Sequence, residues 1–346
     1  RSVVFSGDLG RAQLPIIRDP DLVPAHDVLI VESTYGDRTH DPVDQAAEKL
    51  AAVVQRVVER RGKLIIPAFA VGRTQEIVYE LSALATAGRI PRCPIFIDSP
   101  MAVEATDAFR RHPECFDQQT MERLGQQDDP FGLGRMLYVR SVEESMALNT
   151  RPGPFIIISA SGMMEGGRVL HHLRNSISEP RNAILIVGFQ AENTLGRRIL
   201  RGDPVVNIFG EPHECRAEVI VMNEYSAHAD RDEILRWFQA SRSGPQDILV
   251  VHGEAEQSAA LAERLGRETT ARIQLPTLHE TLGLGGSHGR GRHAPAASPG
   301  HEAASDATDA GDAGRKGHSS RRSRRGEEHQ GPRRQPGRRT GRRGHR

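Results

Sequence analysis

Four side chains that could serve a metal-dependent hydrolase each stand just past a short apolar run of the kind that forms a β-strand. In parallel α/β folds, working residues gather just past the carboxyl ends of the strands. Zinc accepts carboxylate and imidazole ligands, and a water bound to it reaches a pKa near neutrality and becomes a nucleophile. Each residue alone is weak evidence, because a histidine after a strand is often structural and an aspartate between glycines is common in turns. The four residues are Asp8, Glu32, His228 and His252.

Two further segments could bind phosphate. Residues 155–168, FIIISASGMMEGGR, have the order strand, Ser/Gly turn, helix start, and residues 67–74, PAFAVGRT, repeat it. Such turns present backbone N–H groups and hydroxyls to an anion at a helix N-terminus. Neither is a Walker or dinucleotide-binding loop. The alternative is that the glycines only permit close packing, but an arginine in each turn favours a phosphate-bearing ligand. The candidate contacts are Ser159, Ser161, Arg73 and Arg168.

The elements that must position these residues alternate between apolar runs and amphipathic segments, which predicts an α/β fold with largely parallel sheets. Runs of continuous Val, Ile and Leu predict strands covered on both faces. One helix is expected with Asp41 as N-cap, Pro42 in its first turn and Gly62 at its end. Another begins at Asp230, where Glu233 completes a capping box. The predicted strands are Val3–Phe5, Val28–Val31, Lys63–Pro67, Pro94–Ile97, Phe155–Ser159, Ala183–Val187, Val205–Phe209, Glu218–Met222 and Ile248–Val251.

The net charge of +1 is the sum of two unlike parts. Of the 46 basic and 45 acidic residues, 15 and 6 lie in residues 283–346, so this segment carries +9 and residues 1–282 carry −8. The segment is rich in Gly, Pro, Arg and His and has no Val, Ile, Phe, Tyr or Trp. It cannot bury enough apolar surface to offset the entropy of ordering. We expect a disordered basic tail that either adds nonspecific nucleic-acid contact or is a solvated, dispensable extension.

Three further features narrow the class of protein. No apolar run approaches the roughly 18–20 residues of a membrane span, so no membrane contact is expected. No signal-peptide pattern opens the chain. The three cysteines, Cys93, Cys115 and Cys215, form no C-x-x-C pair. This disfavours a disulfide framework or a cysteine zinc cage and is typical of a cytoplasmic protein.

Seven motifs in order make the chain similar to the β-CASP branch of the metallo-β-lactamase superfamily, which comprises RNA-processing nucleases such as the cleavage and polyadenylation endonuclease. The motifs, within residues 2–282, are SGDLGR, ESTYGD, PAFAVGRTQE, DSPMA, SASGMMEGGR, SAHAD and VHGE. The resemblance implies a metallo-β-lactamase αββα sandwich, here partial, interrupted by an α/β β-CASP domain. It places the sandwich in residues 1–38 and 224–282, the β-CASP domain in residues 39–223 and the tail in residues 283–346.

The resemblance also implies a role for each site residue. Asp8 matches a carboxylate that bridges two zinc ions, and His252 matches a zinc-ligating histidine. Glu32 matches an acidic residue that orients a catalytic histidine. His228 matches the histidine that contacts the scissile phosphate and helps to protonate the leaving oxygen. Two metal ions clamp the attacking and leaving oxygens of an in-line displacement, and a carboxylate partner fixes the tautomer of an imidazole. The RNA phosphate contacts that the resemblance implies are Ser226, Ser159 and Ser161.

The family's H-x-H-x-D-H motif, which supplies most of its zinc ligands, is absent from the sequence. We expect the chain to begin about halfway through the metallo-β-lactamase domain, the complete protein to be a two-zinc ribonuclease, and this chain alone to be inactive. A non-catalytic RNA-binding or scaffolding member is the first alternative, disfavoured because the four site residues are intact. A hydrolase of small phosphorylated molecules is the second, disfavoured by the long inserted domain. The sequence does not distinguish exonuclease from endonuclease action. Whether the protein forms a homodimer also stays open.

Overall fold

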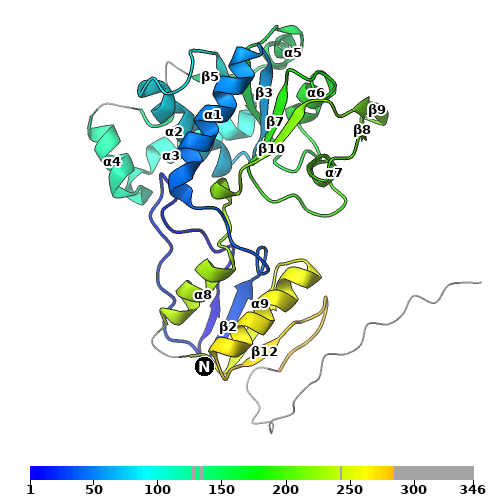
Figure 1. The fold of residues 1–346 in the computed structure, drawn as a ribbon. Helices are drawn as coiled ribbons and strands as arrows, with labels where there is room; N and C mark the ends of the chain where they lie inside the picture. The colour runs from blue at the N-terminus through cyan, green and yellow to red at the C-terminus, as the bar shows by residue number, and fades with distance from the viewer. Residues whose placement is uncertain (127–128, 133–135, 242–243, 284–346) are drawn as a thin grey trace, which may run out of the picture. The chain divides into compact units, whose positions relative to one another are not determined.

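Two parallel sheets form the framework of the residues that the computed structural model describes, which are 1–126, 129–132, 136–241 and 244–283. These residues belong to one compact unit of the chain. Helices connect the strands and cover the sheets (Figure 1). The predicted α/β class with parallel sheets is therefore confirmed. The predicted tail, residues 283–346, lies outside the described residues except for Gly283.

The smaller sheet joins two segments that lie far apart in the sequence. Its strands, in the order in which they pair, are β1 (Val3–Phe5), β2 (Val28–Glu32), β11 (Asp247–Val251) and β12 (Arg272–Gln274). All its pairs are parallel. Helices α8 (Arg231–Gln239) and α9 (Ala255–Glu268) supply Ile234 and Leu261 to a core shared with Leu29 of β2. This sheet provides the strand ends at which three of the four candidate residues stand.

The larger sheet has six described strands, and all its pairs are parallel. In pairing order they are β10 (Glu218–Val221), β7 (Ala183–Ile186), β3 (Lys63–Pro67), β6 (Phe155–Ser159), β4 (Ile95–Ile97) and β5 (Met136–Tyr138). A short antiparallel hairpin, β8 (Val205–Ile208) with β9 (Glu211–Glu214), stands beside it. Because this sheet is formed by residues 63–221, it lies between the two halves of the smaller sheet in the sequence. The exact domain boundaries stay a prediction.

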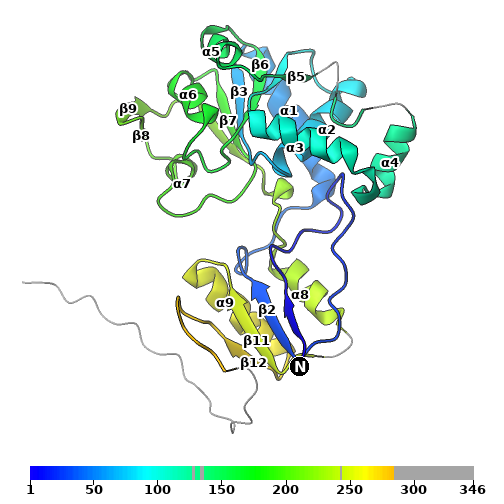
Figure 2. The same cartoon turned by 180° about the vertical axis from the view of Figure 1, so that it is seen from behind.

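Helices cover the larger sheet on both faces, as its continuous apolar strands predict (Figures 1 and 2). The helices between residues 46 and 200 are α1 (Ala46–Glu59), α2 (Arg73–Thr86), α3 (Pro100–Arg111), α4 (Gln118–Gly125), α5 (Val142–Thr150), α6 (Arg168–Arg174) and α7 (Leu195–Leu200). Successive side chains of a strand point to opposite faces. Leu64 and Ile66 of β3 share a core with α1 and α2, whereas Ile65 packs with α6 and α7.

The first predicted helix begins later than its sequence signals indicate. Asp41 is not its N-cap, because Pro42 is extended (ψ 135°) and a 3₁₀ turn, η1 (Val43–Gln45), comes before α1. The Asp41 carboxylate instead pairs with Lys49 Nζ at 3.0 Å. The helix ends at Glu59, just before the predicted glycine, and its predicted apolar face is buried. The prediction of the helix is therefore confirmed, and that of its N-cap is wrong.

Three short strands, β5, β9 and β12, were absent from the predicted set. Each has only three or four residues, and β9 (EPHE) and β12 (RIQ) carry the charged residues and proline that ordinarily argue against a strand. The remaining short turns are η2 (Pro113–Cys115) and η3 (Asn223–Tyr225). Among the described helices, none is both long and apolar enough to span a membrane.

Candidate active site

Asp8, Glu32 and His252 come from three neighbouring parallel strands. β2 pairs with β1 on one side and with β11 on the other, and Val251 lies opposite Glu32 in that register. Asp8 follows β1 closely, Glu32 ends β2, and His252 directly follows β11. Parallel neighbours end at the same edge of a sheet, so the loops that follow them start side by side. The topology of the smaller sheet therefore brings these residues together.

His228 joins them from a different element, the loop between η3 and α8. Its backbone forms an antiparallel bridge with Gly10, in the loop that carries Asp8. Two residues later α8 begins with a capping box, in which the Asp230 carboxylate accepts from Glu233 N and the Glu233 carboxylate accepts from Asp230 N, both at 2.8 Å. This capping box, predicted from the sequence, fixes where the helix starts. The position of His228 follows from the bridge and this cap.

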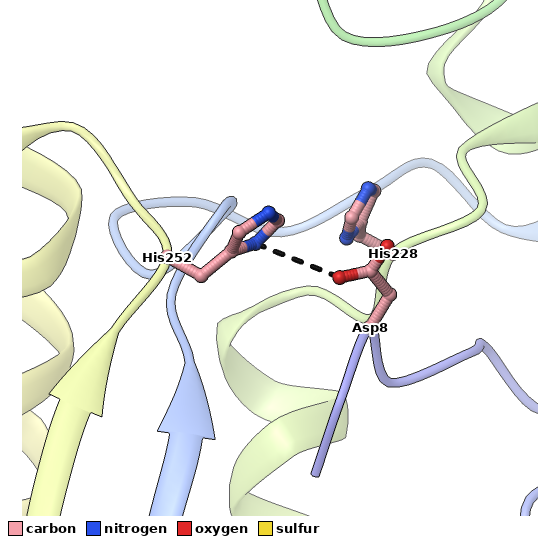
Figure 3. A group of neighbouring side chains, drawn as sticks. All are labelled: Asp8, His228 and His252. Carbon is pink, nitrogen blue, oxygen red and sulfur yellow. Dashed lines mark ion pairs between the residues drawn. The ribbon is translucent and has the colours of Figure 1, made fainter.

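Asp8, His228 and His252 place three metal-ligating side chains around one point (Figure 3). One donor atom of each lies within 4.8 Å of the other two. Nδ1 of His252 is 3.7 Å from Oδ1 of Asp8, and these side chains are 58% and 70% exposed. The two imidazole rings lie 5.8 Å apart between centroids. An ion or a substrate phosphate can therefore reach this cluster from solvent.

Glu32 is the buried partner that orients His228. Its Oε2 lies 2.9 Å from His228 Nδ1, and its side chain is only 1% exposed against 20% for the imidazole. The other oxygen, Oε1, accepts from Leu9 N at 2.5 Å, and Thr34 Oγ1 donates to Oε2 at 2.7 Å. Because a carboxylate only accepts, Nδ1 of His228 must carry the proton of that bond. The opposite nitrogen, Nε2, is therefore the one free for a ligand or substrate.

The surroundings of His228 raise the pKa of its imidazole above the ordinary value of 6.5. Burial alone is the largest influence and lowers this pKa, but the hydrogen bond to Glu32 and the charges of Glu32 and Asp8 together outweigh it. His40, whose Nε2 lies 3.2 Å from the His228 carbonyl oxygen, has the opposite balance. Burial first, and then Arg11, lower the pKa of His40 to about 4. Of these two imidazoles, His228 is the one favoured in its protonated form.

Close packing holds the loop that carries His252. The residue adopts a left-handed backbone (φ 54°), and its carbonyl oxygen accepts from Ser33 N at 3.3 Å. A Cβ atom on Gly253 would lie 2.7 Å from the Ser33 carbonyl oxygen, so only glycine fits there without a shift. Arg197 Nη2 lies 3.0 Å from Glu254 Oε2, which ties α7 to the same loop. These contacts fix the direction in which His252 leaves the strand.

A cavity of about 750 Å³ opens beside the three donors. Its volume lies within the range of small-molecule and cofactor sites. Its lining includes the metal-ligating cluster, the start of α2 and several large apolar side chains. The lining residues used below are Arg73, Glu76, Ser226, Phe69, Val71, Met101, Met163, Phe189 and Glu254.

Of the predicted phosphate contacts, Ser226 and Arg73 line this cavity. The Ser226 hydroxyl donates to the His228 carbonyl oxygen at 3.3 Å. Arg73 is 4% exposed and forms an ion pair with Glu76. The SASGMMEGGR turn does not contribute its predicted contacts to the cavity lining. The Ser159 hydroxyl donates to the Asp98 carbonyl oxygen at 2.8 Å, and Ser161 Oγ accepts from the backbone N of residue 165 at 3.1 Å.

Arg168, the remaining predicted contact, belongs to a buried network around Asp98. The Asp98 carboxylate accepts from Arg168 Nη1 at 2.7 Å and from Ser145 Oγ at 2.6 Å, and it lies 2.6 Å from His172 Nε2. The Asp98 and His172 side chains are fully buried. Burial raises the pKa of Asp98, but the bonds from His172, Ser145 and Arg168 outweigh it and lower the pKa below 3.8. The network therefore anchors the start of α6, where the predicted phosphate-binding turn ends.

The cluster contains ligand types that suit zinc or a similar divalent ion. Asp8 and His252 supply a carboxylate and an imidazole, and catalytic zinc sites leave further positions to water or substrate. The Glu32–His228 hydrogen bond orients the second imidazole, as carboxylate partners do beside metal centres. Two atoms that are each about 2 Å from one ion lie at most about 4 Å apart, so donors separated by up to 4.8 Å must move closer together to hold it.

Sequence reasoning missed Thr34, which lies among the site residues. Its hydroxyl is 3.3 Å from Nδ1 of both His228 and His252, besides donating to Glu32. It stands two residues after Glu32 in the ESTYGD motif, but a threonine there is also a common turn residue. Phe189 was missed as well, because no local pattern shows that its ring lies 5.6 Å from that of Tyr35. Only tertiary contacts identify these residues.

Comparison with known families gives two matches. The family model of the Beta-Casp domain matches residues 74–199, and that of the Zn-dependent metallo-hydrolase RNA specificity domain matches residues 212–276. The first covers α2 to α7 of the larger sheet. The second covers His228 and His252, with α8, β11 and α9, and therefore the candidate metal cluster apart from Asp8.

Several curated proteins are similar over most of this chain. Ribonuclease TTHA0252 of Thermus thermophilus is 40% identical over 266 residues, which are 77% of this chain and 60% of that protein. Transcription termination factor FttA of Methanosarcina mazei is 33% identical over 80% of this chain and 45% of its own length. The RNase J-like protein of Methanocaldococcus jannaschii is 31% identical over 80% and 63%. The chain thus spans about half the length of these relatives. With both family models matched and the predicted motifs in place, the chain belongs to the β-CASP branch of the metallo-β-lactamase superfamily.

Proposed function

We propose that this protein hydrolyses RNA phosphodiester bonds with a zinc centre held in part by Asp8 and His252. The observation that carries the proposal is the convergence of Asp8, His228 and His252 within 4.8 Å, with Glu32 behind His228. The names of the matched relatives, a ribonuclease and an RNase J-like protein, support an RNA-processing hydrolase. The name of the second matched domain supports zinc and RNA.

Each site residue has a distinct task in this proposal. A bound zinc ion supplies a Lewis acid for the phosphoryl oxygens and a water of lowered pKa. Asp8 and His252 hold the metal, in keeping with their exposure and with the roles that the family resemblance implies. His228 keeps one proton on Nδ1 for Glu32 and presents Nε2 to the leaving oxygen. The buried Glu32 carboxylate behind Nδ1 would stabilise the imidazolium that carries a second proton on Nε2 and donates it to that oxygen.

The remaining predicted contacts are part of the proposal. Ser226 and Arg73 would contact the phosphate in this proposal, and their presence in the cavity lining supports it. Ser159, Ser161 and Arg168 would meet RNA only with a rearrangement of their internal bonds. The basic segment that follows Leu282 would add nonspecific attraction to the phosphate backbone, which weakens with salt. The two zinc ions that the resemblance implies require ligands besides Asp8 and His252. The homodimer stays a prediction.

The test is cleavage of a labelled single-stranded oligoribonucleotide by the complete protein with added zinc. We expect cleavage that is lost with a chelator and restored by zinc, and we expect this chain by itself to leave the RNA intact. Binding of the RNA without cleavage by the complete protein would support the scaffolding alternative. Preference for a small phosphorylated substrate, such as p-nitrophenyl phosphate, would support the second alternative.

A matched pair of histidine variants controls the test. His252→Gln removes a proposed ligand, whereas His112→Gln alters a histidine of similar exposure, 63% against 58%, away from the site. We expect the first to abolish cleavage and the second to leave it unchanged. Equal activity of the two variants would contradict the proposed site.

A further inference from the structure

One wall of the cavity beside the metal-ligating cluster is apolar although it faces solvent. Phe69, Val71 and Met101 are 44%, 62% and 64% exposed and line the cavity, and Met163 and Phe189 extend the same lining. Exposed apolar patches next to a polar site mark binding surfaces, because exposing them to water is unfavourable. None of the predicted phosphate contacts involves these apolar residues, so their exposure has no explanation in that role.

The two aromatic rings of the wall are held in place. The ring of Phe69 lies against the backbone of Gly162, where a Cβ atom would come within 2.9 Å of it. The ring of Phe189 packs edge-to-face on Tyr35 at 5.6 Å, and the Arg197 guanidinium stands 5.9 Å from its centroid. A larger residue at Gly162, or loss of the Tyr35 ring, would therefore shift the ring that it contacts. In the unaltered chain the two rings form a fixed apolar surface.

The charges of the lining disfavour a second phosphate as the occupant of this wall. Arg73 is the one lysine or arginine among the described lining residues, and it is paired with Glu76. Asp8 adds a carboxylate to the same lining, and Glu254 adds one that is paired with Arg197. A phosphate group in the apolar part would meet no unpaired lysine or arginine of the described lining. An uncharged, planar group attached next to a phosphate fits both the wall and the metal cluster.

We propose that this wall binds the unpaired base of a nucleotide adjacent to the scissile phosphate, with Phe69 and Met101 as its principal contacts. The inference rests on the proposed ribonuclease function and names the side chains that would contact that base. A base within a duplex is paired and stacked, so its faces are not available to the wall. Stacking on aromatic side chains tolerates any base, so the wall selects for an unpaired base rather than for a sequence.

The test measures RNA binding by this chain in the presence of a chelator, so that no cleavage interferes. A fluorescent eight-nucleotide single-stranded RNA is compared with versions that carry one abasic nucleotide at each position in turn. We expect one abasic position to weaken binding about tenfold. We expect Phe69→Ala and Met101→Gln to weaken binding of the intact RNA by a similar factor and to leave binding of that abasic RNA unchanged.

Matched controls distinguish an effect of the wall from an effect of exposed apolar residues elsewhere on the chain. Phe209→Ala changes a phenylalanine of similar exposure, 50%, and Met146→Gln changes a methionine that is 64% exposed, and neither lines the cavity. Both should bind the intact RNA as the unaltered chain does. If RNA binds but every abasic version binds equally, or if the wall variants weaken intact and abasic RNA alike, the wall proposal is wrong and the ribonuclease proposal stands. If no RNA binds and the complete protein does not cleave RNA, both fail.

Discussion

Oε2 of Glu32 lies 2.9 Å from Nδ1 of His228, although 195 residues separate the two in the sequence. The carboxylate is buried and also accepts from Leu9 N and Thr34 Oγ1. It is therefore fixed before any ligand arrives. This arrangement gives the imidazole one defined orientation and one defined tautomer, which is what a group that donates a proton to a leaving oxygen requires.

Under the proposed function, Glu32→Gln should lower the rate of RNA cleavage about 10–100-fold. The amide keeps the shape of the side chain but removes the charge that raises the pKa of His228. The rate of cleavage at saturating RNA and the histidine pKa, followed by NMR in the metal-free chain, check this. Glu59→Gln, an exposed glutamate on α1 that bonds only to Gln55 among the described contacts, serves as the control. A wild-type rate together with an unchanged histidine pKa would remove Glu32 from the account.

Gly253→Ala should weaken zinc binding while the chain stays folded. The added Cβ would come 2.7 Å from the Ser33 carbonyl oxygen, so the loop that carries His252 must shift. Overpacking of this kind costs about 1–3 kcal/mol, which is less than the free energy of unfolding of a typical folded protein. Zinc titration and urea unfolding measure the two effects separately. Gly125→Ala, where the added atom meets no neighbour within 4 Å, is the matched control. Unchanged zinc affinity in Gly253→Ala would show that this close approach does not position His252.

Asp98→Asn should destabilise the chain at neutral pH by about 3 kcal/mol, because it leaves Arg168 and His172 beside a neutral amide in a buried site. The pKa of Asp98 is lowered in the folded protein, so the unfolded chain takes up its proton at a higher pH. The stabilisation by Asp98 is therefore complete above pH 3.8 and is lost as the pH falls from there through the lower, folded pKa.

Urea unfolding of both proteins between pH 7 and pH 3 checks this sign. The difference between wild type and Asp98→Asn should be largest at neutral pH and should shrink below pH 4. Asp107→Asn, whose side chain is 45% exposed and pairs with Arg110 and Arg140, should change the free energy of unfolding by less than about 0.5 kcal/mol. A difference that grows on acidification would mean that the network does not lower the pKa of Asp98.

Much of the fold follows from local pattern. The continuous Val, Ile and Leu runs of β3, β6 and β7 are buried on both faces, so their composition alone identifies them. β5, β9 and β12 lack that signal, because short or polar strands at edges are stabilised by partners elsewhere in the chain. The predicted N-cap at Asp41 was wrong because Pro42 is extended and the 3₁₀ turn η1 comes between Asp41 and α1.

The site could be predicted in part. Asp8, Glu32 and His252 follow strands that proved to be parallel neighbours, so a rule about strand ends was sufficient to group them. Thr34 and Phe189 act through contacts with residues more than 150 positions away, and no local spacing encodes such contacts. The arginine in the SASGMMEGGR turn had a pattern typical of phosphate binding, yet its guanidinium bonds to a buried aspartate. A local motif cannot reveal an internal partner.

The most direct test of the metal centre is a zinc titration of this chain, followed by calorimetry and repeated with Co²⁺ absorption to report the ligands. Asp8→Asn and His252→Gln should each reduce the affinity at least about tenfold, and His112→Gln should not change it. His228→Gln should reduce the affinity less than His252→Gln does, because its proposed task is proton donation. If Asp8→Asn and His252→Gln bind zinc as tightly as the unaltered chain, these residues do not form a metal centre.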